Sequence, residues 1–180
     1  MKDFLPFKGF LCPGIYFSSG YCVWLMHWNY TPTEVEAFSE IWVFTPENNR
    51  TAYIDPVEAI AIFKIYHDFN SAIGAEITWD CKDSRSLFAT LLASNNTVMD
   101  IQLKLGPAFD INAVNEAVTE TGMAVRHQSD RIVAIENACA SFNGIDLGKI
   151  SNPPKPIYVG SARVLADPVI SFCTHYLESS

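Results

Sequence analysis

The segment that most constrains the fold is residues 20–30, GYCVWLMHWNY, which are largely apolar or aromatic at both odd and even positions. Successive side chains of a strand point to opposite faces of a sheet. Because both sets of positions are apolar here, the segment predicts a strand that is buried on both faces.

Length and composition predict one compact domain with more apolar residues than its core requires. The chain has 180 residues, of which 49% are apolar and 18% are charged. A chain of this length buries roughly two thirds of its unfolded surface, and we expect a single domain over residues 1–180. The charged fraction lies below the globular norm of about 25%. The apolar surplus indicates a ligand cavity, a subunit interface, or both.

Four segments carry the capping residues and spacing of helices. Residues 33–42 follow a Thr cap and repeat apolar side chains at helical spacing, and 55–68 begin with Asp-Pro. Residues 110–122 are bounded by an Asp cap and a Gly stop. Residues 129–144 favour a helix by their apolar spacing, although 131–138 could also form a strand.

Strands are predicted from alternating polarity and from turn residues. Apolar side chains alternate with Glu76, Thr78 and Asp80 in one such segment. The predicted strands are 73–80, a hairpin of 86–93 and 97–106, a short strand at 123–128, and 157–165 and 169–177 after the proline-rich linker 151–156. The mixed order of elements predicts an α+β fold with a curved, barrel-like antiparallel sheet and helices packed on one side.

Charge and cysteine usage restrict the compartment and the partners. The net charge of −8 and the lack of any basic run argue against nucleic acid and anionic membranes as partners. No apolar run reaches about 18 residues, so no membrane span is expected. The five cysteines are widely spaced and lack a C-x-x-C pair, which is typical of a reduced, cytoplasmic protein.

Several motifs that mark cofactor-dependent enzymes are missing. The sequence has no dinucleotide-binding, phosphate-loop, zinc-protease or nucleophile-elbow motif. The four histidines at 27, 67, 127 and 175 lack metal-like spacing, so we expect no metal site. An enzyme of this sequence is therefore expected to work without a cofactor.

Four polar residues are candidates for proton transfer: His175, Glu76, His67 and Lys104. His175 shares a strand face with Ser171 and Cys173, whose small side chains leave room for a ligand. If the sheet encloses Glu76 and Lys104, desolvation would raise the pKa of the first and lower that of the second.

Each of these candidates also has a structural alternative. His175 would then be a core histidine bonded to a backbone carbonyl. His67 would lie at a helix end beside an exposed Lys64–Asp68 pair. Glu76 and Lys104 would lie on the solvent-exposed face of the sheet.

Five further residues are candidates for binding a substrate: Arg163, Tyr158, His27, Trp24 and Trp28. Arg163 shares a strand face with large apolar residues, where a guanidinium can clamp a carboxylate or carbonyl. The aromatic residues around His27 suit an apolar or conjugated ligand, and they suit a dense core equally well.

Residues 52–62, AYIDPVEAIAI, with the strands at 75–79 and 88–106, resemble the acetoacetate decarboxylase-like group. A vaguer similarity continues in 160–172. The resemblance implies an antiparallel, barrel-like core around an apolar pocket. It also implies a Schiff-base lysine shortly after the helix, yet the corresponding stretch 68–74, DFNSAIG, contains no Lys. A member without that amine would retain the pocket and use general acid–base chemistry.

Two hypotheses of function follow. The first is a small cofactor-independent lyase, isomerase or cyclase that acts on an apolar carbonyl-bearing molecule, such as a polyketide or terpenoid intermediate. The second is a non-catalytic ligand-binding or assembly protein, in which the apolar surplus forms a carrier cavity or a homodimer interface.

Overall fold

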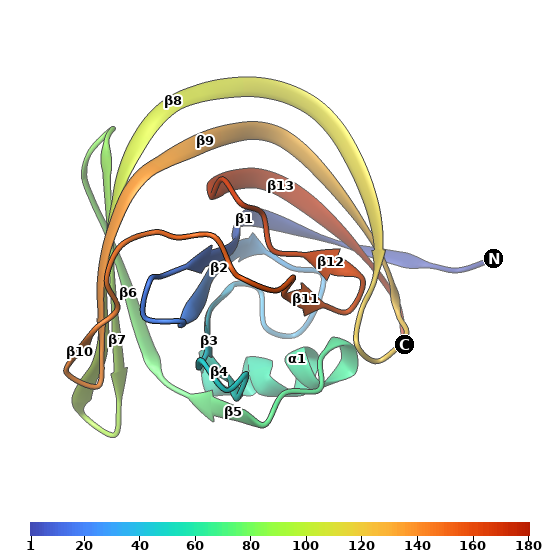
Figure 1. Ribbon diagram of the computed structural model, residues 1–180. Helices are drawn as coiled ribbons and strands as arrows, with labels where there is room; N and C mark the ends of the chain where they lie inside the picture. Colours follow the sequence, from blue (N-terminus) through green and yellow to red (C-terminus); the bar gives the residue numbers. More distant parts are fainter.

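The computed structural model describes residues 1–180 and is mostly β (Figure 1). One α-helix, α1, and a short 3₁₀ helix, η1, interrupt the strands. The elements are β1 (Phe4–Tyr16), β2 (Cys22–Tyr30), β3 (Phe38–Phe44), β4 (Arg50–Asp55), η1 (Val57–Ala59), α1 (Ile60–Tyr66), β5 (Ser71–Gly74), β6 (Glu76–Asp83), β7 (Ser86–Ala93), β8 (Asn96–Val118), β9 (Ala124–Phe142), β10 (Ile145–Asp146), β11 (Tyr158–Val159), β12 (Ala162–Arg163) and β13 (Val169–Glu178). The expected α+β class is therefore corrected to a mostly β fold.

The main sheet has eleven strands and a mixed topology. Its hydrogen-bonded order is β5-β4-β3-β2-β1-β13-β9-β8-β7-β6, with β10 beside β9. Pairing is antiparallel except between β4 and β5, where Thr51 lies opposite Ser71 in a parallel ladder. The path begins at β5 and ends at β6, so the sheet does not close on itself. Strands β8, β9 and β13 curve strongly, in line with the predicted curvature (Figure 1), whereas the predictions of an antiparallel sheet throughout and of several helices on one side are wrong.

The sheet has a separate apolar cluster on each face of β1–β3. Val23 and Leu25 of β2 belong to the first cluster, which extends to β6–β9. Trp24 and Trp28 of the same strand belong to the second, which includes Phe63 of α1. The predicted two-sided burial of residues 20–30 is thus confirmed for the body of β2.

The long strands β8 and β9 join these two regions. Their register shifts near Lys104, Leu105 and Asp110, where an extra residue on β9 at the first shift and extra residues on β8 at the other two interrupt regular pairing. Such bulges bend and twist a strand pair. Figure 1 shows both strands arching over β1 and β2.

Three of the predicted helices are wrong. Residues 33–42 form an irregular segment and then β3, while 110–122 and 129–144 lie largely in β8 and β9. The caps and spacing in those segments are genuine, but β8 and β9 pair with each other from Met99–Phe142 to Val118–Ala124. A ladder of that length outweighs intrinsic preferences, which are a weak prior.

Two further local predictions are confirmed, and a third is corrected. The helix predicted in 55–68 corresponds to η1 and α1, and the hairpin of 86–93 and 97–106 is β7–β8. The strand expected at 157–165 is broken into the two-stranded hairpin β11–β12, with Gly160 at φ 55° in its turn. No helix in the structure has the length and apolar character that crossing a bilayer requires.

Candidate active site

A cavity of about 480 Å³ lies on the second apolar cluster. Its base is one face of β1, β2, β3 and β13, and its sides come from α1, the β11–β12 hairpin and the distal ends of β8 and β9. Aromatic side chains dominate the walls: Phe7, Trp24, Trp28, Phe38, Trp42, Phe63 and Tyr66. The volume and lining are those of a small-molecule site.

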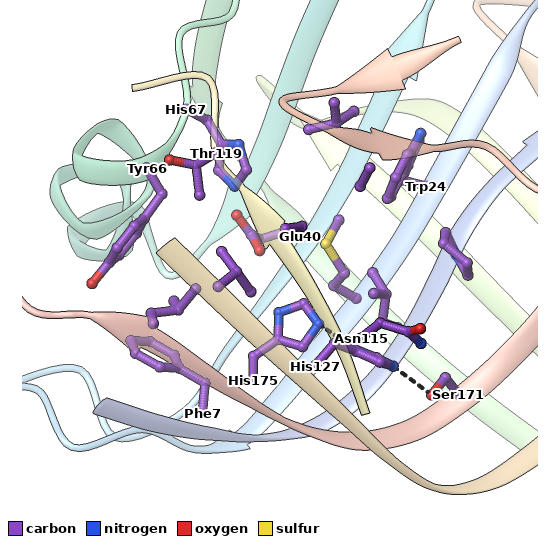
Figure 2. Close-up of a pocket in the computed structure, with 18 of the residues that line it drawn as sticks. Phe7, Trp24, Glu40, Tyr66, His67, Asn115, Thr119, His127, Ser171 and His175 are labelled. Carbon is purple, nitrogen blue, oxygen red and sulfur yellow. Dashed lines mark hydrogen bonds between the residues drawn. The ribbon is translucent and has the colours of Figure 1, made fainter. Parts of the chain in front are cut away.

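Alternation along the strands determines which side chains reach the cavity. On β3, Glu40 and Trp42 are two residues apart and line it, whereas Ile41 points to the opposite cluster. On β13, Ser171 and His175 are four residues apart, so alternation places them on the same face, and both line the cavity. Figure 2 shows Glu40, His67 and His175 directed into this one cavity from β3, the end of α1 and β13.

Glu40 is the most deeply buried carboxyl of the cavity, with 5% of its surface exposed. Trp28 donates its indole N–H to Glu40 Oε2 at 3.2 Å. Burial raises the pKa of Glu40, and the nearby His67 and the indoles of Trp28 and Trp42 only partly offset this effect. The environment therefore favours the protonated carboxyl, which is a hydrogen-bond donor.

His175 belongs to a hydrogen-bonded network that continues into the sheet. Its Nε2 lies 2.5 Å from His127 Nδ1. His127 Nε2 lies 2.7 Å from Ser129 Oγ and 3.1 Å from Ser171 Oγ, and the two hydroxyls are 2.7 Å apart. This arrangement holds the His175 ring in place, while its Nδ1 makes no hydrogen bond within the protein.

Burial also determines the charge of the two imidazoles. The pKa of His175 is well below 6.5, first because of burial and then because of His127 and His67. Burial likewise lowers the pKa of His127, although Asp130 opposes the change. Both rings therefore favour the neutral form, in which His175 can accept a proton.

His67 lies at the rim, immediately after α1. Its Nδ1 is 3.3 Å from Glu120 Oε1, and its ring stacks on Phe63 with centroids 5.0 Å apart. The Trp42 ring approaches it edge-on at 4.7 Å. His67 thus forms part of an aromatic wall and is held there by Glu120.

Two histidines of the cavity, His127 and His175, could hold a metal ion together with the neighbouring Cys173. The donor atoms of His127, Cys173 and His175 lie within 4.8 Å of one another. In this structure the two imidazoles bond to each other instead, and burial raises the pKa of the Cys173 thiol to about 12. A metal would have to replace that hydrogen bond and the thiol proton. The geometry as it stands is that of a hydrogen-bonded network.

Five of the nine residues predicted from the sequence meet at the cavity: His175, His67, Arg163, Trp24 and Trp28. The other four do not line it. Glu76 and Lys104 are exposed on the wet side of their strands, and Tyr158 is 46% exposed on the β11–β12 hairpin. His27 lies on the opposite face of β2, where Nδ1 bonds Ser39 Oγ at 2.9 Å. The expectation that the sheet encloses the polar stripe of Glu76 and Lys104 is therefore wrong.

Sequence reasoning missed Glu40, His127, Ser129 and Ser171 as polar residues of the site. Glu40 was assigned to a helix, where one acidic residue among apolar neighbours is unremarkable. As a strand, FSEIWVF (38–44) is fully buried, and a carboxyl at its centre is exceptional. That contrast would have identified Glu40, given the correct secondary structure.

The low pKa values of the histidine pair predict a loss of stability in acid. An unfolded histidine binds its proton near pH 6.5, before the folded one does. The stabilisation from neutral burial is thus complete above pH 6.5 and is lost as the pH falls below it. In urea titrations between pH 8 and 5, His175→Gln should lose less stability than wild type. The difference in free energy of unfolding between His175→Gln and wild type at pH 8 measures the packing lost. If the free energies of unfolding of the two proteins change in parallel with pH, the prediction is wrong.

Solved structures of acetoacetate decarboxylase-like enzymes share this fold over nearly the whole chain. The enduracididine biosynthesis enzyme MppR with bound HEPES matches with a TM-score of 0.56 and 10% identity, covering 99% of this chain and 87% of that one. The same enzyme complexed with pyruvate matches at 0.53 and 8%, covering 100% and 90%. An acetoacetate decarboxylase-like enzyme from Sphingomonas wittichii RW1 matches at 0.51 and 10%, covering 98% and 91%.

No family model matches the sequence, and no curated protein matches it. At these identities the likeness concerns the fold. One chemical difference from the expected decarboxylase pattern is visible at the site itself, because none of the residues that line the cavity is a lysine.

Proposed function

We propose that the protein is a cofactor-independent enzyme that moves a proton next to a carbonyl group, in an isomerisation, elimination or cyclisation. The observation that carries the proposal is the pairing of Glu40 and His175 in one apolar cavity. Their environments shift the two pKa values in opposite directions, so that the carboxyl tends to hold its proton and the imidazole tends to lack one. Such a divided pair is the arrangement expected of an acid and a base.

The roles follow from the hydrogen bonds that each group makes. The protonated carboxyl of Glu40 donates to the substrate's carbonyl oxygen, and His175 Nδ1 removes the proton from the adjacent carbon. The electrons of the broken C–H bond then form a carbon–carbon double bond, and the carbonyl electrons move to the oxygen that Glu40 stabilises. Return of the proton at another carbon gives isomerisation, whereas loss of a neighbouring leaving group gives elimination.

His127 and Trp42 assist these two groups. The positive charge that forms on His175 is shared with His127, whose Nε2 contacts Ser129 and Ser171. Trp42 Nε1 is buried and makes no hydrogen bond within the protein. Both Trp42 and Glu40 line the cavity from β3, so this free indole N–H is available as a second donor to the substrate oxygen.

The likeness of fold supports a carbonyl compound as the substrate, since one similar enzyme was solved with pyruvate. The lack of a lysine in the lining argues against Schiff-base decarboxylation. A ligand-binding protein without catalysis is the second candidate, favoured by the aromatic walls. It would bind the same molecules and leave their protons in place.

The test is proton exchange with a simple aryl ketone. Incubation of 2-acetylnaphthalene with the protein in deuterated water should exchange the methyl protons faster than buffer does, as followed by ¹H NMR. His175→Gln should slow this exchange at least about tenfold, with His127 left as a poorer base. His27→Gln, which alters a histidine on the opposite face of β2, is the matched control. Exchange that is undetectable, or equal in His175→Gln, rejects the proposal; EDTA should have no effect.

A further inference from the structure

The charges that face the cavity are unevenly distributed. Glu40 lies in the interior of the cavity that His127 and His175 also line, and His67 at the rim is already paired with Glu120. The only Lys or Arg among the lining residues is Arg163, which is exposed on β12 and makes no ion pair. The inner cavity thus offers hydrogen-bond donors and aromatic surface but no fixed positive charge.

This distribution works against a negatively charged ligand. A buried carboxylate is tolerated when a cation or several donors compensate for its lost hydration. In the inner cavity a ligand carboxylate would meet Glu40, whose own ionised form is already disfavoured by burial. The net charge of −8 adds a weak, long-range repulsion of anions. A neutral carbonyl has neither difficulty and can accept a hydrogen bond from Glu40.

The walls favour a flat ligand. The Trp28 ring lies 5.0 Å from the His175 ring, and the Trp24 and Trp42 rings are 5.2 Å apart. Aromatic surfaces of this kind gain most from planar, conjugated partners, which stack against their faces or edges.

We infer that the cavity selects uncharged, planar, conjugated carbonyl compounds and discriminates against carboxylates. The inference deepens the proposed function and rests on it, because the same Glu40–His175 region would receive the carbonyl group. The fold alone would suggest a keto acid as the substrate, whereas the charges in this cavity favour an uncharged carbonyl compound.

Matched probes test the selectivity by isothermal titration near neutral pH. The neutral ketone 2-acetylnaphthalene and the anion 2-naphthoate share one ring system and differ in charge. We expect the ketone to bind at least about tenfold more tightly, which corresponds to about 1.4 kcal/mol. Glu40→Gln should not tighten the binding of naphthoate, because the protonated carboxyl that it replaces is already uncharged and the amide adds no positive charge to the inner cavity. Lys104→Gln, outside the cavity, should keep the wild-type gap.

The outcomes separate this inference from the proposed function. If naphthoate binds as tightly as the ketone or more tightly, the inference is wrong. If Arg163→Gln then loses naphthoate binding, the anion binds at the rim. Proton exchange is measured on the same ketone samples. Selective binding without exchange supports the inference and rejects the proposed function, whereas exchange together with carboxylate preference rejects the inference alone.

Discussion

Glu40→Gln is expected to reduce the rate of carbonyl-adjacent proton exchange by about 10²- to 10⁴-fold, the usual contribution of a well-placed acid. The amide still accepts the hydrogen bond from Trp28 Nε1, which is 3.2 Å from Glu40 Oε2 in wild type. It cannot supply an acidic proton to the developing enolate, so the loss should fall on turnover rather than on ketone binding.

Glu76→Gln is the matched control for this substitution. It makes the same chemical change on an exposed strand position that does not line the cavity. Exchange kinetics of the two variants and of wild type, measured by ¹H NMR on one ketone, decide the matter. If Glu40→Gln keeps the wild-type rate, Glu40 has no role in proton transfer and the proposed pair is wrong.

Glu40→Gln also tests the direction of the Glu40 pKa shift without any substrate. Burial raises that pKa above its ordinary value of 4.5, so the folded protein holds the proton more tightly than the unfolded chain does. Stability is therefore lost as the pH rises from about 4.5 through the folded pKa. Glu40→Gln removes this loss, and its free energy of unfolding should improve relative to wild type as the pH is raised.

The sequence predicts a residue of the site only where its pattern also identifies the strand that carries that residue. Trp24, Trp28 and His175 were identified because alternation places them on one face of predicted strands, and they line the cavity. Alternation alone does not say which face is inside. The alternation in β6 and β8 is therefore equally compatible with polar faces that line an interior, although Glu76 and Lys104 are exposed to solvent.

The fold was predictable where the pattern is local, as in α1 and the β7–β8 hairpin. It was not predictable where long-range pairing decides. Residues 110–118 carry a helix cap and good helical spacing, but they continue β8 because β9 lies beside them, from Asp110–Arg131 to Val118–Ala124. Such a contact between distant segments leaves little trace in the local sequence.

Gly9→Ala is expected to be the most destabilising single-methyl change in the chain. Gly9 lies in β1 between Trp28 of β2 and Cys173 of β13, at a shift in register. A Cβ built there would lie 1.9 Å from the carbonyl oxygen of His27 and 2.9 Å from the Cα of Trp28. Both are backbone atoms of β2, which cannot rotate away as a side chain can, so β1 and β2 would have to separate at the base of the cavity.

The expected cost of Gly9→Ala is about 4 kcal/mol or more, in the range reached by severe strain against a neighbouring backbone. Domains of this kind have roughly 5–15 kcal/mol in total, so the variant should lose roughly a quarter or more of its stability. Gly106→Ala is the control, because its Cβ would approach the flexible, exposed side chain of Glu136 at 2.9 Å. Both changes reduce the freedom of the unfolded chain equally, by an effect of about 0.4–1 kcal/mol. Urea denaturation followed by circular dichroism measures the difference, and a Gly9→Ala protein within about 1 kcal/mol of Gly106→Ala would show that β1 and β2 do not approach this closely.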